Sequence, residues 1–167
     1  TGELAHTESP LSITAGNGPR HMAFHPAGKL AFVIHELTSQ LSSCSWDAES
    51  GKLIELATVS TLPTGFTGNN STAEVLVHPN GKFVYGSNRG HNSIAGFRVE
   101  SDGSLSELGH TSTEGKTPRN FRIDPTGQFL LAENQQSDSI DSFRIYQHTG
   151  RLSSTGHSIH VGSPCCI

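Results

Sequence analysis

One sequence pattern occurs three times in this chain. In each copy a short hydrophobic segment runs into a turn of the form His/Asp-Pro-x-Gly-Lys/Gln, and a second hydrophobic segment follows. The three turns begin at His25, His78 and Asp124, and their prolines lie 53 and 46 residues apart. A period of about 40 to 50 residues is the length of one four-stranded blade of a β-propeller. The spacing therefore predicts a repeat protein built from β-sheets.

Each copy divides into four short segments rich in β-branched and aromatic residues. In the second copy these segments are Ala73–Val77, Phe83–Ser87, Ser93–Val99 and Leu105–Ser112. The Pro-x-Gly turn joins the first two, and a glycine in the turn 101–104 suits the positive φ of the hairpin that joins the last two. No segment has a helical period. We expect an all-β fold, a β-propeller built of four-stranded antiparallel blades.

The copies also predict how the chain is divided. We expect one partial propeller domain over residues 1–167, in which 1–17 end one blade, 18–71, 72–116 and 117–162 are blades, and 163–167 begin a closing strand. Residues 1–7 read like 149–155, so we expect the chain to open on an outermost strand. About three and a half blades of a probable seven would be present, whereas a ring needs at least about four. We therefore expect N-terminal blades, needed to close the ring, to be missing from this chain.

Composition narrows the classes of function to consider. The formal net charge is −4 and no block of basic residues occurs, so we expect no nucleic acid and no membrane surface as a partner. No run of about 18 apolar residues exists, and the first residues carry no signal region. The three cysteines fit neither a disulfide framework nor metal-ligand spacing. We expect a cytoplasmic protein without metal or organic cofactor.

The register of the turns places a set of polar positions on one face of the propeller. Two strand crossings return the chain to the end from which it started, so the loop before the first strand and the loop after the second share a face. Counting eight residues before and after each turn glycine gives Arg20, Ala73, Arg119, Glu36, Arg89 and Gln135. The next position along gives His21, Glu74 and Asn120. We expect these residues near the mouth of the central channel.

The chemistry of these positions differs between copies, while the turn hardly changes. Arginines can hold an anionic substrate through bidentate contacts, and a carboxylate or an imidazole can take a proton from water. The candidate catalytic residues are Glu36, Arg20, Arg89 and His21. The candidate substrate-binding residues are Arg119, Glu74, His91, Asn120 and Gln135. The alternative is a set of solvated charges, since propeller loops are polar in any case.

Other polar residues have structural interpretations. His25 and His78 lie in the turns on the opposite face, where Asp124 takes their place, so we expect structural hydrogen bonds there. On or beside the outermost strands lie His6, His110, His157 and His160, which we expect at the surface. The segment 42–45, Ser-Ser-Cys-Ser, lacks the apolar alternation of a third strand and favours relaxed packing or a decayed copy.

Four long motifs resemble one known family. They are Gly18–Pro26, Phe66–Glu74, Ser87–Ile94 and Gly115–Phe121. Over these motifs the chain closely resembles the lactonase family of seven-bladed propellers, whose members include the propeller-type 6-phosphogluconolactonase and the fungal carboxy-muconate cyclase. The resemblance runs from end to end of the chain. It implies that the C-terminal half of the family fold is present.

The resemblance also implies a site. The site proposed for the cyclase combines a histidine, an arginine, a glutamate and a second arginine, and by motif the last three fall on Arg20, Glu36 and Arg89. The histidine has no counterpart, because its blade lies before Thr1. These three residues belong to the set that the turn register brings together.

The function implied by this resemblance is hydrolysis of a sugar-derived lactone, most closely 6-phosphoglucono-1,5-lactone to 6-phosphogluconate in the pentose phosphate pathway, without a metal. Glu36, with His21, would activate water, and the arginines would bind the anion and stabilise the oxyanion. The same residues could serve lactone formation from an unsaturated diacid, as in the cyclase, although His21 stands where the cyclase has a bulkier aromatic residue. A non-catalytic propeller that binds a protein partner is the other alternative, but the sequence shows no large apolar patch for it.

Overall fold

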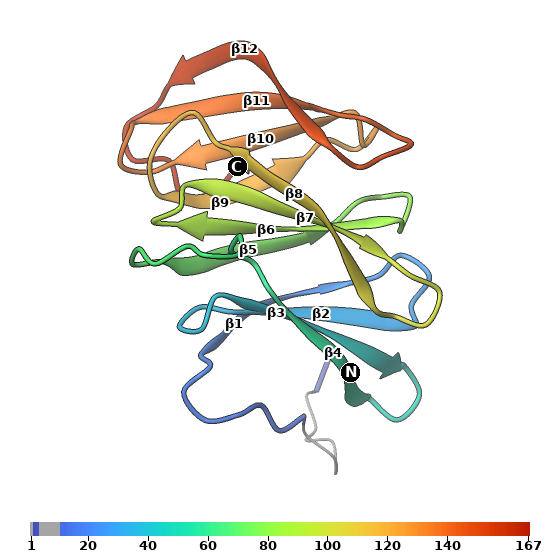
Figure 1. Ribbon diagram of the computed structural model, residues 1–167. Helices are drawn as coiled ribbons and strands as arrows, with labels where there is room; N and C mark the ends of the chain where they lie inside the picture. Colours follow the sequence, from blue (N-terminus) through green and yellow to red (C-terminus); the bar gives the residue numbers. More distant parts are fainter. Residues whose placement is uncertain (1, 4–10) are drawn as a thin grey trace.

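The computed structural model describes residues 2–3 and 11–167. The described chain contains 12 strands in three four-stranded antiparallel sheets, which confirms the all-β propeller fold. The sheets stack face to face as successive blades (Figure 1). No described segment forms a helix that could cross a membrane.

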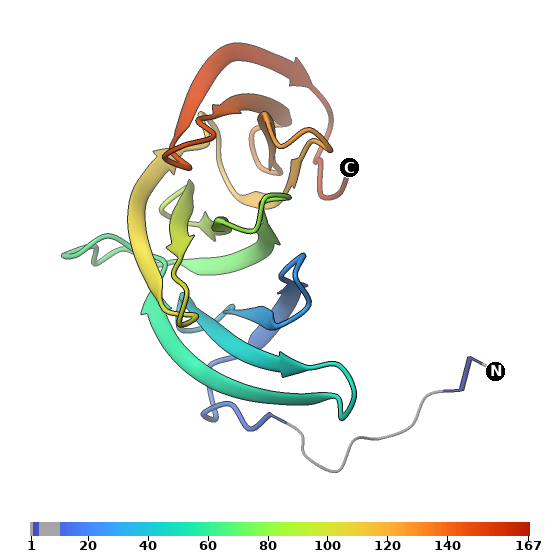
Figure 2. The same ribbon diagram turned by 90° about the vertical axis from the view of Figure 1, so that its right-hand side faces the viewer.

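Within each sheet the strands follow one another in chain order. The first sheet contains β1 (Pro19–Phe24), β2 (Leu30–His35), β3 (Gln40–Asp47) and β4 (Lys52–Ser60). The second contains β5 (Ser71–Val77), β6 (Phe83–Arg89), β7 (Ser93–Val99) and β8 (Leu105–Ser112). The third contains β9 (Pro118–Ile123), β10 (Phe129–Asn134), β11 (Ser139–Ile145) and β12 (Leu152–His160). The first strands of neighbouring sheets, β1, β5 and β9, contact one another, whereas β4 and β8 follow the outer side of the stack (Figure 2).

The two ends of the chain differ from the repeat. The outermost strand expected over residues 1–7 lies, apart from residues 2–3, outside the described residues. No strand is formed by residues 163–167, where the start of a closing strand was expected. Pro164 is nevertheless buried, and Arg122 Nε donates to the carbonyl oxygen of Ile167 at 3.0 Å. This terminal segment therefore lies beside β9.

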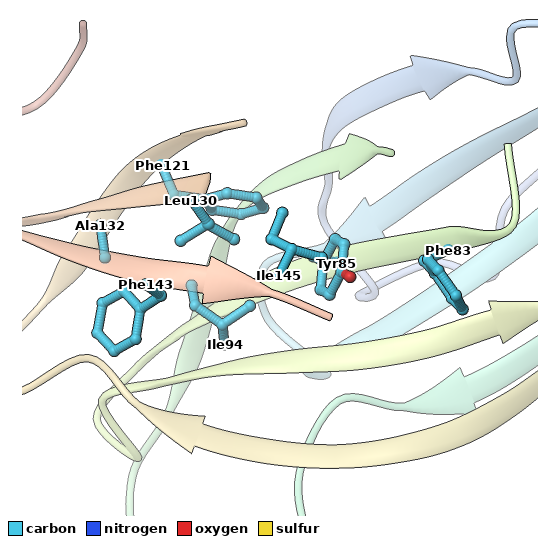
Figure 3. Close-up of a cluster of buried hydrophobic side chains, with 8 residues drawn as sticks. All are labelled: Phe83, Tyr85, Ile94, Phe121, Leu130, Ala132, Phe143 and Ile145. Carbon is cyan, nitrogen blue, oxygen red and sulfur yellow. The ribbon is translucent and has the colours of Figure 1, made fainter. Parts of the chain in front are cut away.

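The interfaces between the blades are hydrophobic. Burying apolar side chains is the main favourable term in such packing. The core between the first two sheets consists of Phe32, Ile34, Leu41, Val75, Val84, Ala95 and Phe97. The core between the last two, shown in Figure 3, consists of Phe83, Tyr85, Ile94, Phe121, Leu130, Ala132, Phe143 and Ile145. Both interfaces hold the inner strands in register.

Histidines in the Pro-x-Gly turns join neighbouring blades. His78 Nδ1 accepts a hydrogen bond from Asn80 N at 3.1 Å, so its proton lies on Nε2, which donates to the Gly127 carbonyl at 2.8 Å. His25 reaches the Gly81 carbonyl of the next blade in the same way at 2.9 Å. The turn glycines adopt positive φ, 73° at Gly81 and 71° at Gly127, which glycine tolerates best. The expected structural role of both histidines is confirmed.

The serine-rich third strand of the first blade is tightly packed, so the expectation of relaxed packing is wrong. Ser42 and Cys44 are fully buried. The Ser42 hydroxyl lies 2.7 Å from His35 Nε2, 2.6 Å from Glu55 Oε1 and 2.7 Å from Thr58 Oγ1. A hydrogen-bond network satisfies the hydroxyl of Ser42, whereas the buried hydroxyl of Ser43 has no hydrogen-bond partner among the described residues.

The expectation of a surface position is also wrong for His110. Its side chain is only 9% exposed, and its Nε2 lies 2.9 Å from the carbonyl oxygen of Thr61, at the start of the connection from β4 to β5. The connection from the neighbouring blade thus contacts a residue that a single blade would expose. His157 and His160 are exposed as expected, and His6 lies outside the described residues.

We expect His78→Ala to destabilise the protein more than the matched variant His25→Ala. His78 is buried, and its removal leaves the Asn80 N–H without an acceptor and a void beside Phe83, a cost of about 1–3 kcal/mol. His25 makes equivalent bonds where water can replace them. Urea unfolding midpoints of the two variants measure the difference. Equal shifts, or no shift for His78→Ala, would contradict this role.

Candidate active site

The turn register places Arg20, Glu36 and Arg89 at one end of the inner strands, and the structure brings the three side chains together. Arg20 lies in β1, Glu36 directly follows β2, and Arg89 ends β6 of the next blade. Glu36 Oε2 is 3.5 Å from Arg20 Nε, and Glu36 Oε1 accepts a hydrogen bond from Arg89 Nη2. One carboxylate thus bridges arginines from two blades.

Backbone carbonyls of β5 hold both arginines. Arg20 Nη1 donates to the Ala73 carbonyl at 2.8 Å, and Arg89 Nη2 donates to the Thr72 carbonyl at 2.8 Å. The two guanidinium groups are mostly buried. Their positions are therefore fixed by the strand between them and by Glu36.

Each inner strand has a β-bulge at the same place, and the bulges include Arg20, Glu74 and Arg119. The pairing shifts by one residue around Arg20 in β1, around Ala73 and Glu74 in β5, and around Arg119 in β9. An extra residue re-aims the local side chains and is common next to active sites. The sequence register found these positions, but it did not predict the bulges.

A second row of polar residues crosses the three blades. Glu74 Oε1 lies 2.9 Å from His21 Nδ1, and Glu74 Oε2 accepts a hydrogen bond from Asn120 Nδ2 at 2.7 Å. The backbone N–H of Val75 also donates to Glu74 Oε1 at 3.0 Å. The three residues at the next position of the repeat are therefore joined directly, from β1 through β5 to β9.

The electrostatics of the cluster favour an anion. The hydrogen bond from Arg89 is the main cause that lowers the pKa of Glu36 below its ordinary value, and the charges of Arg20 and Arg119 act in the same direction. Burial, followed by the charge of Arg89, lowers the pKa of Arg20. Arg119 has no hydrogen bond or ion pair to any residue that the structure describes. Three cations thus face two carboxylates, Glu36 and Glu74.

Glu133 was not among the predicted site residues. This carboxyl is fully buried in β10, opposite Asn120, and neither oxygen has a hydrogen-bond partner. Asn120 Oδ1 is also buried without a partner. Burial is the main cause that raises the pKa of Glu133, and the charge of Glu74 acts in the same direction, whereas the nearby backbone of Ile167 and the charge of Arg122 lower it. An acidic residue directly after the apolar segment 129–132 was the available signal.

Two predicted binding residues, His91 and Gln135, have their hydrogen bonds outside the arginine–glutamate cluster. His91 Nδ1 is 2.7 Å from Ser93 Oγ. The rings of His91 and Phe66 pack edge to face, with 5.0 Å between their centroids. Gln135 follows β10 and donates its backbone N–H to the Thr117 carbonyl at 3.0 Å. Within residues 2–3 and 11–167 neither side chain makes a hydrogen bond or an ion pair to the arginine–glutamate cluster. In the same residues no group of three or more acidic, histidine or cysteine residues could hold a metal ion.

Comparison with known proteins places this geometry in a family. The family described as "Lactonase, 7-bladed beta-propeller" matches residues 1–167. The 6-phosphogluconolactonase of Pectobacterium carotovorum is 42% identical over 154 residues, which cover 91% of this chain and 46% of the relative. The 6-phosphogluconolactonase of Bacillus subtilis is 39% identical over 157 residues, which cover 93% of this chain and 45% of the relative.

Solved structures agree. A protein from Lactobacillus plantarum superimposes with a TM-score of 0.90 and 38% identity, over 93% of this chain and 46% of its own. The periplasmic gluconolactonase of Pseudomonas aeruginosa gives a TM-score of 0.88 and 32% identity, over 93% of this chain and 43% of its own. The chain spans less than half the length of these relatives. It belongs to the lactonase family of seven-bladed β-propellers.

Proposed function

We propose that this site serves hydrolysis of a phosphorylated sugar lactone, most closely 6-phosphoglucono-1,5-lactone to 6-phosphogluconate, a step of the pentose phosphate pathway. The observation that carries the proposal is the bridge from Arg20 through Glu36 to Arg89, with Arg119 alongside. The relatives named 6-phosphogluconolactonase support the same substrate. Arginine suits both phosphate binding and stabilisation of an oxyanion.

The arginines divide into two kinds. Arg20 and Arg89 are held by Glu36 and by backbone carbonyls, so they are preorganised to stabilise the oxyanion that forms when water attacks the lactone carbonyl. Arg119 is half-buried and has no partner among the described residues, so it can bind the phosphate. The mechanism requires no metal, because these cations supply the charge that a metal would supply.

Glu36 is better suited to holding the arginines than to activating water. A general base works best when its pKa lies near the working pH, and the hydrogen bond from Arg89 moves the pKa of Glu36 the other way. His21 lies beside Arg20, and its side chain is 40% exposed, so water can reach it. We therefore propose His21 as the base and Glu36 as the residue that positions the arginines.

We infer that the active form contains further blades of the same polypeptide, upstream of those described. This chain covers less than half of its relatives, and its inner strands line only part of a channel. The assay compares the 167-residue chain with the complete polypeptide, meaning the chain together with its upstream blades. We expect 6-phosphoglucono-1,5-lactone to be hydrolysed by the complete polypeptide only. Equal activity of the chain alone would contradict the need for further blades.

Arg89→Ala in the complete polypeptide should lower kcat/KM at least about tenfold, because an oxyanion donor and the bridge to Glu36 are lost together. Arg151→Ala is the matched control, since Arg151 is exposed before the outer strand β12 and should tolerate replacement. Steady-state kinetics on the phosphorylated lactone measure both variants. An unchanged value for Arg89→Ala would remove this residue from the site.

The variant Arg119→Ala tests whether Arg119 binds the phosphate group of the substrate. The variant should raise KM for 6-phosphoglucono-1,5-lactone about tenfold, the loss of one charge-assisted contact, and should leave kinetics on unphosphorylated glucono-1,5-lactone unchanged. Comparing the two substrates separates an effect on binding of the phosphate group from an effect on the lactone ester. An equal effect on both lactones would place Arg119 at the reacting carbonyl instead.

The pKa of Glu36 predicts a pH-dependent contribution to stability. Its folded-state pKa is depressed, so the stabilising ion pairs are present above the ordinary glutamate pKa of about 4.3 and are lost as the pH falls through the lower folded-state value. Glu36→Gln should therefore have a lower urea midpoint than the unmodified protein at pH 7, and the gap should close in acid. Glu114→Gln, which removes an exposed carboxylate, is the control. A gap that is independent of pH would contradict this assignment.

A further inference from the structure

Hydrogen bonds join His21, Glu74 and Asn120 in a polar row beside the arginines, and this row can take part in the proposed reaction. We propose that Glu74 and Asn120 are positioning residues that fix His21 in the tautomer whose Nε2 lone pair can accept a proton from water, and that Glu133 completes the chain as a neutral carboxylic acid. The inference rests on the proposed function and deepens it. It assigns Glu74 and Asn120 to the orientation of the base instead of to substrate binding.

The contact with Glu74 sets the tautomer of His21. An ionised carboxylate only accepts hydrogen bonds, so the 2.9 Å contact between His21 Nδ1 and Glu74 Oε1 requires the proton on Nδ1. In the neutral imidazole Nε2 then carries a lone pair. A carboxylate in this position holds the ring and stabilises the imidazolium that forms when the base takes a proton.

Arg20 leaves that lone pair open. Its Nη1 lies 3.1 Å from His21 Nε2 and 3.4 Å from His21 Nδ1. A donor placed along the in-plane lone pair of Nε2 would be much farther from Nδ1 than from Nε2, because the in-plane directions at the two ring nitrogens point away from each other. Nearly equal distances therefore place the guanidinium over the face of the ring. Nε2 keeps its in-plane direction free for water, and the ring is accessible to solvent.

Glu74 is itself held firmly. Its Oε1 accepts from the Val75 N–H at 3.0 Å as well as from His21, and its Oε2 accepts from Asn120 Nδ2 at 2.7 Å. The side chain is mostly buried. Three donors converge on one carboxylate and fix its plane. The amide of Asn120 must turn its Nδ2 toward Glu74, so its Oδ1 points away.

Glu133 offers the partner that Asn120 Oδ1 lacks. Asn120 and Glu133 are directly opposite in the β9–β10 pair, and opposed residues have Cβ atoms about 4.5–5.5 Å apart on one face. Asn120 Oδ1 and both Glu133 oxygens are buried without partners. Two acceptors cannot satisfy each other, but a protonated Glu133 has an O–H that can donate to Asn120 Oδ1. Burial raises the pKa of Glu133 more than the backbone of Ile167 and the charge of Arg122 lower it, which agrees with a neutral acid.

In this hydrogen-bonded row each residue has its own role in the reaction. Water attacks the lactone carbonyl carbon and its proton passes to His21 Nε2, while Glu74 stabilises the imidazolium. The tetrahedral oxyanion then collapses, the ring C–O bond breaks, and the leaving oxygen takes the proton back from His21. One water is consumed and one hydroxy acid forms. A neutral Glu133 avoids a second buried negative charge beside Glu74.

Two glutamine variants in the complete polypeptide test the assignment with opposite expectations. Glu74→Gln should lower kcat at least about tenfold with little change in KM, because the residue acts through His21 and does not touch the lactone. Glu133→Gln should keep kcat within about twofold, since an amide N–H can replace the O–H of a neutral acid. Glu133→Leu, which has no donor, should lower kcat. A raised KM for Glu74→Gln, or a large loss for Glu133→Gln, would overturn the assignment.

The tautomer supplies a readout independent of activity. Nitrogen-15 NMR of the histidine-labelled complete polypeptide, with the resonances identified through His21→Gln, should show His21 protonated on Nδ1 and a shift toward the Nε2–H form in Glu74→Gln. His21 protonated on Nε2 in the unmodified protein would overturn the inference even if a variant failed to fold. The two hypotheses can fail separately. If NMR shows the expected tautomer but the complete polypeptide hydrolyses no lactone, the hydrogen-bonded row is supported and only the proposed function is contradicted.

Discussion

The contact between neighbouring inner strands is the constraint on which the rest of this structure depends. β1, β5 and β9 can exchange polar contacts only because the hydrophobic faces of the three sheets pack together along the length of the blades. That packing sets one repeat position against the next. Glu36 pairs with Arg20 of its own blade and with Arg89 of the next, and Glu74 joins His21 and Asn120 from the blades on either side. Of these contacts, a single blade would hold only the pair of Arg20 and Glu36.

The two rows of the site have different electrostatic tasks. In the first row the carboxylate of Glu36 lies between two guanidinium groups, which keeps both arginines close without neutralising the cluster, since Arg119 adds a third positive charge. In the second row the carboxylate of Glu74 faces an imidazole, a pairing that supports proton transfer. In our proposal, adjacent positions of the repeat thus carry anion binding in one row and base chemistry in the next. Repetition supplies the scaffold, and substitution at a few positions supplies the chemistry.

Much of this arrangement could be predicted from the sequence, because turn chemistry and strand length are local properties. The Pro-x-Gly turns predicted the blades, and a count of eight residues from each turn glycine found Arg20, Glu36 and Arg89. What the count missed depends on neighbouring strands and neighbouring sheets. The burial of His110 is caused by the connection that precedes β5, and the partnerless Glu133 is visible only once β9 lies beside β10. The orientation of His91 toward Phe66 likewise follows from packing between connections.

The central claim is that arginines from successive blades share one anion at the channel mouth. A crystal structure of the complete polypeptide with 6-phosphogluconate bound tests it most directly. The account predicts the phosphate against Arg119 and the carboxylate of the product within hydrogen-bond reach of Arg20 and Arg89, with His21 beside it. Product bound on another face, or in contact with none of these arginines, would contradict it.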